Sequence, residues 1–363
     1  MIIKRVVLQN FRNISVADVE LVEGINVLYG ENAQGKTNFL ESIYFCATGR
    51  SHRAGRDRDL IMMSEKEMDA RVFVENKGNL DEIRVRICKE GKTNHINQQP
   101  IKKLGDLYGY LSCVIFSPED LALVKSGPQV RRRFLDMELC QLYPSYYHDL
   151  RMYYKVLKQR NNLLKELTYN KRLLETLALW DEQLVGYGAR IMMAREGFVS
   201  KLSRIAEENQ QNITDGRENL QIIYKNNVDR SVFFEKLEKY RELDMLRGST
   251  SVGIHKDDIE FRINNNDGRN FASQGQQRTA ALAVKLAEIE LVREEKGHPP
   301  VLLLDDVLSE LDKSRQNYLL SSIGGLQAII TLTGAENAIG GYLRKEGVRI
   351  FGVEKGVFSL KNT

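Results

Sequence analysis

One stretch decides the fold, and it runs Ile25-Asn-Val-Leu-Tyr29-Gly30-Glu-Asn-Ala-Gln-Gly35-Lys36-Thr37. Residues 25–29 are a short apolar run typical of a buried strand, and residues 38–46 continue as a helical run. Between them, residues 30–37 fit the pattern G-x-x-x-x-G-K-S/T, which has meaning only in such a strand, loop and helix context. The stretch therefore predicts a loop that binds phosphate groups.

The chemistry of this loop follows from its residue types. Gly30 and Gly35 let the backbone wrap around phosphates, while exposed N–H groups and the helix N-terminus supply positive potential. Lys36 is expected to reach the β- and γ-phosphates of ATP, and Thr37 to bind Mg²⁺. The alternative is a glycine turn before a helix that binds nothing. The remaining predicted nucleotide contacts of the loop are Glu31, Asn32, Ala33 and Gln34.

A second apolar run ends in two carboxylates. Residues 301–304 are Val-Leu-Leu-Leu and precede Asp305 and Asp306, which is the form of a Walker B strand. Asp305 is expected to hold Mg²⁺, and Asp306 to orient or deprotonate the attacking water. Taken alone, the pattern is also typical of a helix cap or a turn. The phosphate loop upstream favours the catalytic interpretation.

A third motif, Ser273-Gln-Gly275-Gln276-Gln-Arg278, precedes a helical run over residues 279–290. A serine hydroxyl, a glycine and a helix N-terminus form an anion site of the same physical kind as the phosphate loop. The alternative is a serine-capped helix start. The order and spacing resemble the signature motif of ABC ATPases, and Ser309-Glu-Leu-Asp312 is similar to the D-loop that follows Walker B there.

Hydrophobic periodicity divides the rest of the chain. From Ser145 to Tyr187 the sequence is helical, because Leu150, Leu157 and Leu164 recur every seven residues. A break at Tyr169-Asn170 then predicts two amphipathic helices in an antiparallel hairpin. Strands are expected over residues 6–8, 25–29, 70–75, 83–89, 259–263, 301–304 and 328–331.

These elements predict an α/β fold. We expect an ABC-type ATPase head with mixed sheets, assembled from residues 1–118 and 251–363. Residues 119–250 would form an inserted helical lobe that contains a short antiparallel coiled-coil hairpin. The length of 363 residues agrees with about two compact units.

Composition limits the class of protein. With 42% hydrophobic and 28% charged residues, the chain has a composition typical of globular proteins. No long apolar core follows its basic first residues, and no run of about 20 apolar residues occurs, so neither a signal segment nor a membrane span nor a membrane partner is expected. The net charge of +4 is too small by itself to indicate nucleic-acid binding. Buried thiols in a reducing cytoplasm are expected from four widely spaced cysteines, which are Cys46, Cys88, Cys113 and Cys140.

Further segments resemble motifs of the RecF family, within the ABC and SMC-type ATPases. The resemblance covers residues 1 to about 360 and implies that Arg12 and Asn13 lie against the nucleotide. It also implies that Asp312 and the signature residues Ser273, Gly275 and Gln276 contact nucleotide. The segments are residues 10–13, 51–61, 116–121, 131–136 and 253–258.

The resemblance implies a function as well. Family members would form a homodimer on ATP and Mg²⁺, in which the nucleotide held by the phosphate loop of one protomer meets the signature loop of the other, and clamp onto DNA as weak, DNA-stimulated ATPases. The clamp would act with RecR and RecO to promote RecA loading in the repair of gapped DNA, in replication and in the SOS response. Contacts to single- and double-stranded DNA would be made to phosphates, without sequence preference, by Arg50, Arg53, Arg56, Arg131, Arg132 and Arg133.

Other polar residues leave alternatives open. ABC proteins usually carry a switch histidine where this chain offers Thr331 and Thr333, and most carry glutamate in place of Asp306, so slow hydrolysis is expected. His52 and His255 either touch phosphate or are solvated loop histidines. A basic cluster on the hairpin is interpreted as solvated helix surface, and its members are Lys155, Lys158, Arg160 and Lys165.

Two other functions fit parts of the pattern. The nucleotide-binding subunit of an ABC transporter shares the phosphate loop, signature and Walker B motifs, but such heads are shorter and lack an insertion of this size. An ATPase that controls an attached nuclease is the second, although no acidic nuclease domain follows the head. Copurification with a membrane protein, or cleavage of DNA with magnesium, would identify either.

Overall fold

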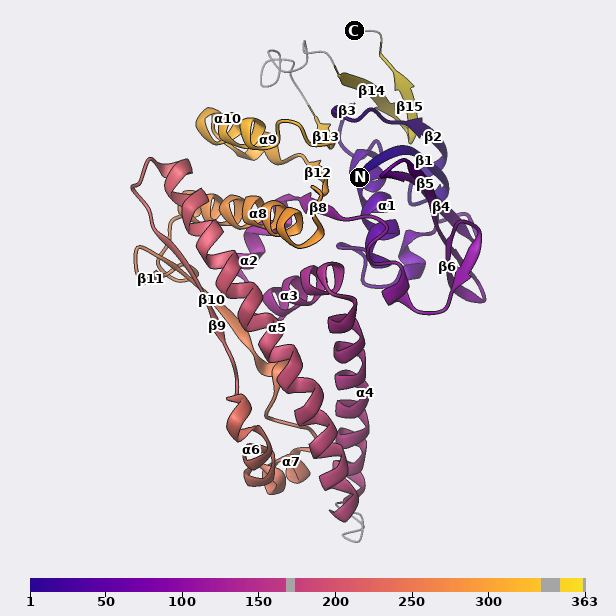
Figure 1. Ribbon diagram of the computed structural model, residues 1–363. Helices are drawn as coiled ribbons and strands as arrows, with labels where there is room; N and C mark the ends of the chain where they lie inside the picture. The colour runs from indigo at the N-terminus through magenta and orange to yellow at the C-terminus, as the bar shows by residue number, and fades with distance from the viewer. Residues whose placement is uncertain (168–173, 334–346, 362–363) are drawn as a thin grey trace. The chain divides into compact units, whose positions relative to one another are not determined.

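The computed structural model describes residues 1–167, 174–333 and 347–361 (Figure 1). The chain divides into two compact units, one formed by Met1–Asp120 with Lys285–Thr363 and the other by Leu121–Val284. We call the first unit the head and the second the lobe. Each is described by itself.

A mostly parallel sheet carries the deciding stretch of the head. Its order is β15-β14-β3-β13-β12-β8, and only β15 runs antiparallel to its neighbour. The carboxyl ends of the parallel strands meet at one edge, where ligands of open α/β sheets bind. The strands are β3 (Ile25–Tyr29), β8 (Cys113–Phe116), β12 (Val301–Asp305), β13 (Ala328–Leu332), β14 (Val348–Glu354) and β15 (Val357–Leu360).

A second head sheet is antiparallel, with the order β2-β1-β4-β5-β6-β7. Helix α1 (Lys36–Thr48) packs against strands of both sheets, and its residues from Phe39 to Thr48 are all buried. A helix that is apolar on nearly every side is stable only when it is covered on every side. The strands are β1 (Ile2–Phe11), β2 (Ile14–Glu20), β4 (Met68–Asn76), β5 (Asn79–Cys88), β6 (Gly91–Ile96) and β7 (Gln99–Ile101).

Further helices complete the head, and one of them crosses its border. Helix α8 (Gln274–Lys296) starts in the lobe and ends in the head, because the border between the units falls at residues 284–285. The other elements are 3₁₀ turns at Asp57–Leu60, Leu104–Asp106 and Pro118–Asp120, followed by α9 (Val307–Glu310) and α10 (Lys313–Ser322).

The lobe is mainly helical and also contains a three-stranded sheet of order β11-β10-β9. Its strands are β9 (Leu220–Lys225), β10 (Asp258–Ile263) and β11 (Asn266–Asp267). Its helices are α2 (Leu121–Lys125), α3 (Pro128–Leu142), α4 (Pro144–Leu167), α5 (Leu174–Thr214), α6 (Phe233–Lys239) and α7 (Arg241–Arg247), with 3₁₀ turns at Arg230–Val232 and Ile254–Lys256.

Helices α4 and α5 pack side by side and run antiparallel (Figure 1). Two ion pairs fix the direction, because Asp149 meets Arg190 while Arg160, further along α4, meets Asp181, earlier in α5. The predicted break at Tyr169-Asn170 lies outside the described residues. Helix α5 continues to Thr214, well beyond the predicted hairpin. The coiled-coil character of the pair stays a prediction.

The predicted α/β class is confirmed, and every predicted strand overlaps an observed one, although the strand predicted over residues 83–89 ends one residue earlier, at Cys88. The lobe, however, extends to Val284 rather than to residue 250. The reason is that β10 pairs with β9 inside the lobe, although its apolar pattern resembles that of the head strands. Sequence patterns alone do not report which strand a given strand will pair with.

Buried thiols were expected, and three of the four cysteines are buried. All four cysteines are free thiols; Cys46, Cys113 and Cys140 are buried, and Cys88 is partly exposed. In the part of the chain that the structure describes, no helix is both long enough and apolar enough to cross a membrane.

Candidate functional site

The phosphate loop starts where β3 ends and leads into α1, as predicted. Gly35 has a φ of 115° at the helix N-cap, a backbone conformation that suits glycine alone. Gly30 is required for a different reason, since a Cβ atom there would lie 2.3 Å from the carbonyl oxygen of Val353 in β14. The loop is therefore fixed by its own glycines and by a neighbouring strand.

Lys36 is held inside this loop. Its side chain is buried, and Nζ donates to the carbonyl oxygens of Gly30 at 2.5 Å and Glu31 at 2.6 Å. Burial lowers the pKa of Lys36 from its ordinary value, and the negative charges of Asp306 and Asp305 oppose that shift. The ammonium thus lies within a loop of backbone groups that also faces the carboxylates of Walker B.

Asp305 joins the two predicted halves of the site. It ends β12 with only 5% of its surface exposed, and its Oδ1 accepts hydrogen bonds from Thr37 Oγ1 at 2.7 Å and Thr331 Oγ1 at 2.9 Å. Burial raises the pKa of Asp305, while the two hydroxyl donors lower it in part. Hydroxyl and carboxylate oxygens are the ligands that Mg²⁺ prefers, so Thr37 and Asp305 fit this ion.

Asp306 lies at the next position, in the left-handed region with a φ of 52°. Its backbone N–H donates to Thr331 Oγ1 at 2.9 Å, and Thr333 Oγ1 lies 3.4 Å from its Oδ1. Thr331 therefore links both carboxylate residues, at the strand end where a switch histidine was expected from other ABC proteins. Hydroxyl groups orient Asp305 and Asp306 here.

The far side of the loop is held by residues from both ends of the chain. Asn13 Nδ2 donates to the carbonyl oxygen of Ala33 at 3.0 Å. The side-chain oxygen of Gln34 accepts the Lys355 N–H at 2.7 Å, and its carbonyl oxygen accepts the Gly356 N–H at 2.8 Å. The sequence did not indicate this hairpin of β14 and β15, because no motif marks it. The exposed loop residues Glu31 and Asn32 lie at its rim.

Arg12 is paired with an acidic residue of α1, and its contact with nucleotide stays a prediction. Its guanidinium forms a two-pronged ion pair with Glu41, which is fully buried in α1, with N···O distances of 2.9 and 3.0 Å. Burial acts against the charge of Glu41, but the hydrogen bonds from Arg12 and Ser51 outweigh it and lower the pKa of Glu41. Arg12 therefore fastens the end of β1 to α1, next to Asn13 at the loop.

The predicted DNA contacts Arg50, Arg53 and Arg56 are all exposed in the head. Arg53, however, lies close enough to Asp305 to lower the pKa of that carboxyl, and its Nε lies 4.0 Å from Glu119 Oε1. Arg53 and Glu119 therefore belong to the surroundings of the Walker B carboxylates. The sequence analysis named segment 116–121 but gave no role to Glu119, which lies three residues after β8, the strand beside β12.

The second predicted arginine set lies on α3 in the lobe. Arg131 is 5% exposed and donates to both carboxylate oxygens of Asp258, at 2.6 and 2.8 Å. Because the Arg131 guanidinium is buried in this ion pair, its assignment as a DNA contact does not fit the described conformation. Arg132 is partly exposed and donates to the carbonyl oxygen of Asp257 at 2.7 Å, whereas Arg133 is exposed.

The signature residues begin α8 in the lobe. The Gln276 N–H donates to Ser273 Oγ at 3.2 Å, and the Ser273 N–H donates to Gln276 Oε1 at 3.0 Å, which is a reciprocal capping box. Ser273 and Gly275 are exposed. The serine-capped helix start, which was the alternative to an anion site, is therefore present. The other N–H groups at the start of α8 remain open to solvent.

Asp312, the D-loop residue, caps α10. Its side chain accepts the Arg315 N–H at 2.9 Å and also pairs with the Arg315 guanidinium. The Arg315 N–H bond and the nearby guanidinium lower the pKa of Asp312 despite some burial. The carboxylate is 53% exposed and remains accessible to another molecule.

His255 is a structural residue of the lobe in this conformation. Its Nε2 lies 3.0 Å from the Thr250 carbonyl oxygen and therefore donates to it, so its Nδ1 accepts from Tyr153 Oη at 2.8 Å. Burial lowers the pKa of His255 to about 4, which keeps the ring neutral. His52 lies edge-on to Tyr44 in the head, with ring centroids 5.3 Å apart. His255 therefore lacks the surroundings of a phosphate ligand.

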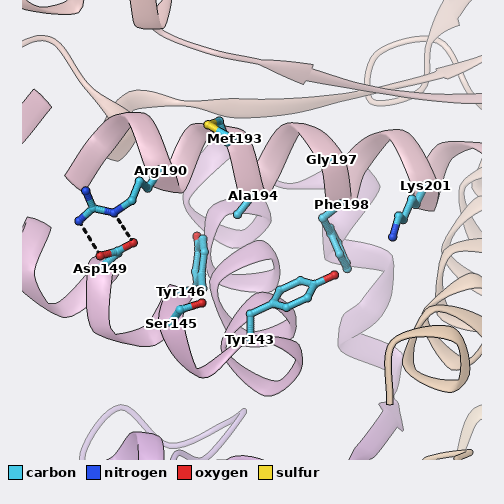
Figure 2. A pocket seen from close by; sticks show the side chains of 10 residues that line it. All are labelled: Tyr143, Ser145, Tyr146, Asp149, Arg190, Met193, Ala194, Gly197, Phe198 and Lys201. Carbon is cyan, nitrogen blue, oxygen red and sulfur yellow. Dashed lines mark hydrogen bonds and ion pairs between the residues drawn. The ribbon is translucent and has the colours of Figure 1, made fainter. Parts of the chain in front are cut away.

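The lobe also contains a cavity of about 500 Å³ between the start of α4 and the middle of α5 (Figure 2). Figure 2 shows Tyr143 and Tyr146 on one side and Met193 on the other, with Asp149 and Arg190 paired at one end. None of the predicted site residues lines it. Among the described residues, no cluster of metal-ligating side chains is present.

Comparison with known proteins agrees with this geometry. A family model described as the RecF/RecN/SMC N terminal domain matches residues 2–355. The DNA replication and repair protein RecF of Lachnoclostridium phytofermentans is 46% identical over 361 residues, covering 98% of this chain and 99% of that protein. RecF of Lachnospira eligens is 47% identical over 343 residues, covering 93% and 94%.

Solved structures are similar as well. The structure of the recombination mediator protein RecF with ATP in the RecFOR pathway has a TM-score of 0.93 at 36% identity, covering 99% of this chain and 97% of that one. An Smc head bound to the C-winged helix domain of ScpA has a TM-score of 0.57 at 14% identity. The second similarity concerns the fold alone.

Proposed function

Because this chain belongs to the RecF family of DNA replication and repair proteins, within the ABC and SMC-type ATPases, we propose that it binds ATP, dimerises on it and clamps onto DNA. The observation that carries the proposal is the hydrogen bond between Thr37 of the phosphate loop and Asp305 of Walker B. It brings the two halves of a nucleotide site together across 268 positions of sequence. The RecF structure with ATP in the RecFOR pathway supports the same ligand.

Nucleotide binding would use the loop as a cradle for phosphate oxygens. The N–H groups at the start of α1 supply partial positive charge, and Lys36 exchanges two carbonyl acceptors for phosphate. Thr37 and Asp305 would hold Mg²⁺, which supplies positive charge to the phosphates when bound. Asn13 and Gln34 keep the loop in shape from behind.

Hydrolysis would depend on Asp306. Thr331 holds its backbone N–H and Thr333 lies next to its carboxylate, which would orient the attacking water or accept its proton. An aspartate reaches one methylene less far than the glutamate of most ABC heads. We therefore propose a weak, DNA-stimulated ATPase in which slow hydrolysis sets the lifetime of the ATP dimer.

Dimerisation would complete the site. Ser273 and Gly275 are exposed at the start of α8, and their anion site would contact the nucleotide bound by a second copy of the chain, with Gln276 and Asp312 nearby in that interface. ATP would then be buried between two protomers, and its γ-phosphate would favour the closed state. Loss of that phosphate would release the dimer.

The dimer would mark gapped DNA in the cytoplasm by phosphate contacts, without sequence preference. The candidates are the exposed Arg50, Arg56 and Arg133 and the partly exposed Arg132. In the pathway we propose RecR and RecO as partners and RecA loading as the outcome, during repair, replication and the SOS response. The names of the curated relatives do not favour the transporter alternative.

The mass of the protein in solution tests the core of this proposal. We expect one chain, 41.6 kDa, without nucleotide, and twice that mass with ATP and Mg²⁺. The Lys36→Met variant is the control, since it should remain at the mass of one chain under both conditions. A wild-type protein that stays monomeric at saturating ATP, with and without DNA, contradicts the proposal.

A further inference from the structure

One face of α4 carries a continuous row of polar residues. Steps of three and four residues place side chains on the same side of a helix. Along α4 these steps connect six positions, four of them cationic. We call this row the α4 basic face, and it consists of His148, Arg151, Lys155, Lys158, Asn162 and Lys165.

All six side chains of the α4 basic face are exposed. Its four cations form no hydrogen bond or salt bridge with any residue that the structure describes. Other cations of the lobe are bound to carboxylates, including one that the sequence grouped with the basic face. These paired residues are Arg131, Arg160, Arg190 and Arg195.

Only two carboxylates of α4 lie near the row, and one of them points away from it. Asp149, next to His148, points to α5 and binds Arg190 with both oxygens at 2.8 Å (Figure 2). Glu166 is the other acidic residue of the helix beside the row. The opposite side of α4 packs into the lobe through Leu150, Leu157 and Leu164, which fixes the direction in which the basic face points.

The charge pattern suits a long, regular anion. From Arg151 to Lys165 the row is about 21 Å long, because each helical residue adds about 1.5 Å. Arg151, Lys155 and Lys158 are spaced closely enough to act as one field, since screening extends over about 8 Å at physiological salt, and Lys165 follows about 10.5 Å further along the helix. A strand of duplex DNA presents one phosphate per about 3.4 Å of axis, so about six phosphates lie along this length.

We propose that the α4 basic face binds the phosphate backbone of duplex DNA. The assignment rests on the proposed function, since it names the surface through which the lobe contacts DNA. Duplex rather than single-stranded DNA is the occupant because single-strand sites combine cations with aromatic side chains in series, on which bases stack. Tyr154 is the one exposed aromatic side chain of α4 beside the row, and a single ring does not form a stacking series.

The test measures duplex binding as a function of salt. Lys155→Gln combined with Lys158→Gln removes two adjacent cations of the row without introducing a negative charge. The matched control is Lys201→Gln with Arg204→Gln, because these exposed residues of α5 have the same spacing and lie in the same lobe. Both proteins are titrated with a fluorescent duplex of arbitrary sequence, with ATP and Mg²⁺, between about 0.05 and 0.2 M salt.

Each lost phosphate contact should lower the slope of log affinity against log salt by about 0.9. The α4 double variant should therefore lose about 1.8 from the slope and bind duplex about 30-fold more weakly at 0.15 M salt. The control should match the wild type. Lys155→Arg with Lys158→Arg should retain binding, because the charges remain, and ATP-dependent dimer mass should be unchanged in all variants.

Three outcomes overturn the assignment. If the wild type binds duplex with ATP but the α4 variant matches the control, the DNA proposal stands and the α4 basic face is not the contact. A loss confined to single-stranded DNA overturns the choice of duplex. If the wild type dimerises on ATP and binds no duplex at all, both the assignment and the proposed function fail.

Discussion

At the scale of single residues, two adjacent carboxylates have been given different surroundings. Asp305 is buried and accepts two hydroxyl hydrogen bonds on one oxygen, which suits an ion ligand held still. Asp306 is partly exposed in a left-handed backbone conformation and has one weak side-chain contact, to Thr333. A carboxylate with that freedom can reorient toward water, which is why we assign the two residues different roles.

Asp306→Asn separates these roles. The variant should bind ATP and Mg²⁺ as the wild type does, because Thr37 and Asp305 are unchanged. Its turnover should fall by about 10²–10⁴-fold, the usual contribution of a general base, so that the ATP dimer persists. Steady-state phosphate release and the lifetime of the dimer on dilution measure both effects. Unchanged turnover would assign the water to another residue.

His255 gives a pH dependence that tests its structural role. Burial lowers its pKa from the ordinary value of 6.5 to about 4, so its contribution to the stability of the lobe is complete above pH 6.5 and is lost as the pH falls toward 4. The free energy of unfolding should decrease by up to about 3 kcal/mol from this residue over that interval.

The control for this residue is His255→Gln, which cannot take up the proton. It should be less stable than the wild type near pH 7, because the contacts to Tyr153 and Thr250 change. The difference between the two proteins should shrink between pH 6.5 and 4, as followed by urea denaturation. Parallel curves would show that His255 titrates normally in the folded protein.

Residue types predicted the chemistry of the site better than they predicted the charged surface. Lys36, Thr37 and Asp305 follow from motifs whose spacing the chemistry demands, and the structure brings them together. Lys158 and Arg160 look equivalent in sequence, yet the first is exposed and the second is buried against Asp181 and Asp244. Burial of a cation depends on carboxylates far away in the chain, which no local pattern reports.

At the scale of elements, the phosphate loop depends on the hairpin of β14 and β15. Gly30 lies directly against the carbonyl oxygen of Val353, and Gln34 binds the turn between the two strands. Phe39 packs on Phe358 with ring centroids 4.8 Å apart. The hairpin lies more than 300 positions after the loop. Its short strands carry no motif, and strand pairing at that separation cannot be derived from periodicity.

Gly30→Ala tests this support. The added methyl group would meet the Val353 carbonyl oxygen, so we expect a loss of about 1–3 kcal/mol in the free energy of unfolding, together with weaker ATP binding. Gly197→Ala in α5 is the control, since nothing lies within 4 Å of its Cβ position. Alanine there should leave stability unchanged or raise it by about 0.5–1 kcal/mol. Equal behaviour of the two variants would contradict the close approach of β14.

At the scale of the whole molecule, one complete nucleotide site would need two copies of the chain. The phosphate loop and Walker B lie in the head, whereas Ser273 lies in the lobe at the exposed start of α8. Mixing Ser273→Arg with Lys36→Met should therefore assemble one composite site from two inactive proteins, and partial dimerisation with slow turnover should return. Neither variant alone should recover.

The mass of Ser273→Arg in solution with saturating ATP and Mg²⁺ tests the central claim most directly. ATP binding, measured separately, should stay close to the wild type because every phosphate-loop residue is intact. Light scattering should nevertheless give 41.6 kDa, the mass of one chain, where the wild type gives twice that value. A Ser273→Arg protein that dimerises with ATP as the wild type does would contradict a nucleotide site shared between two protomers.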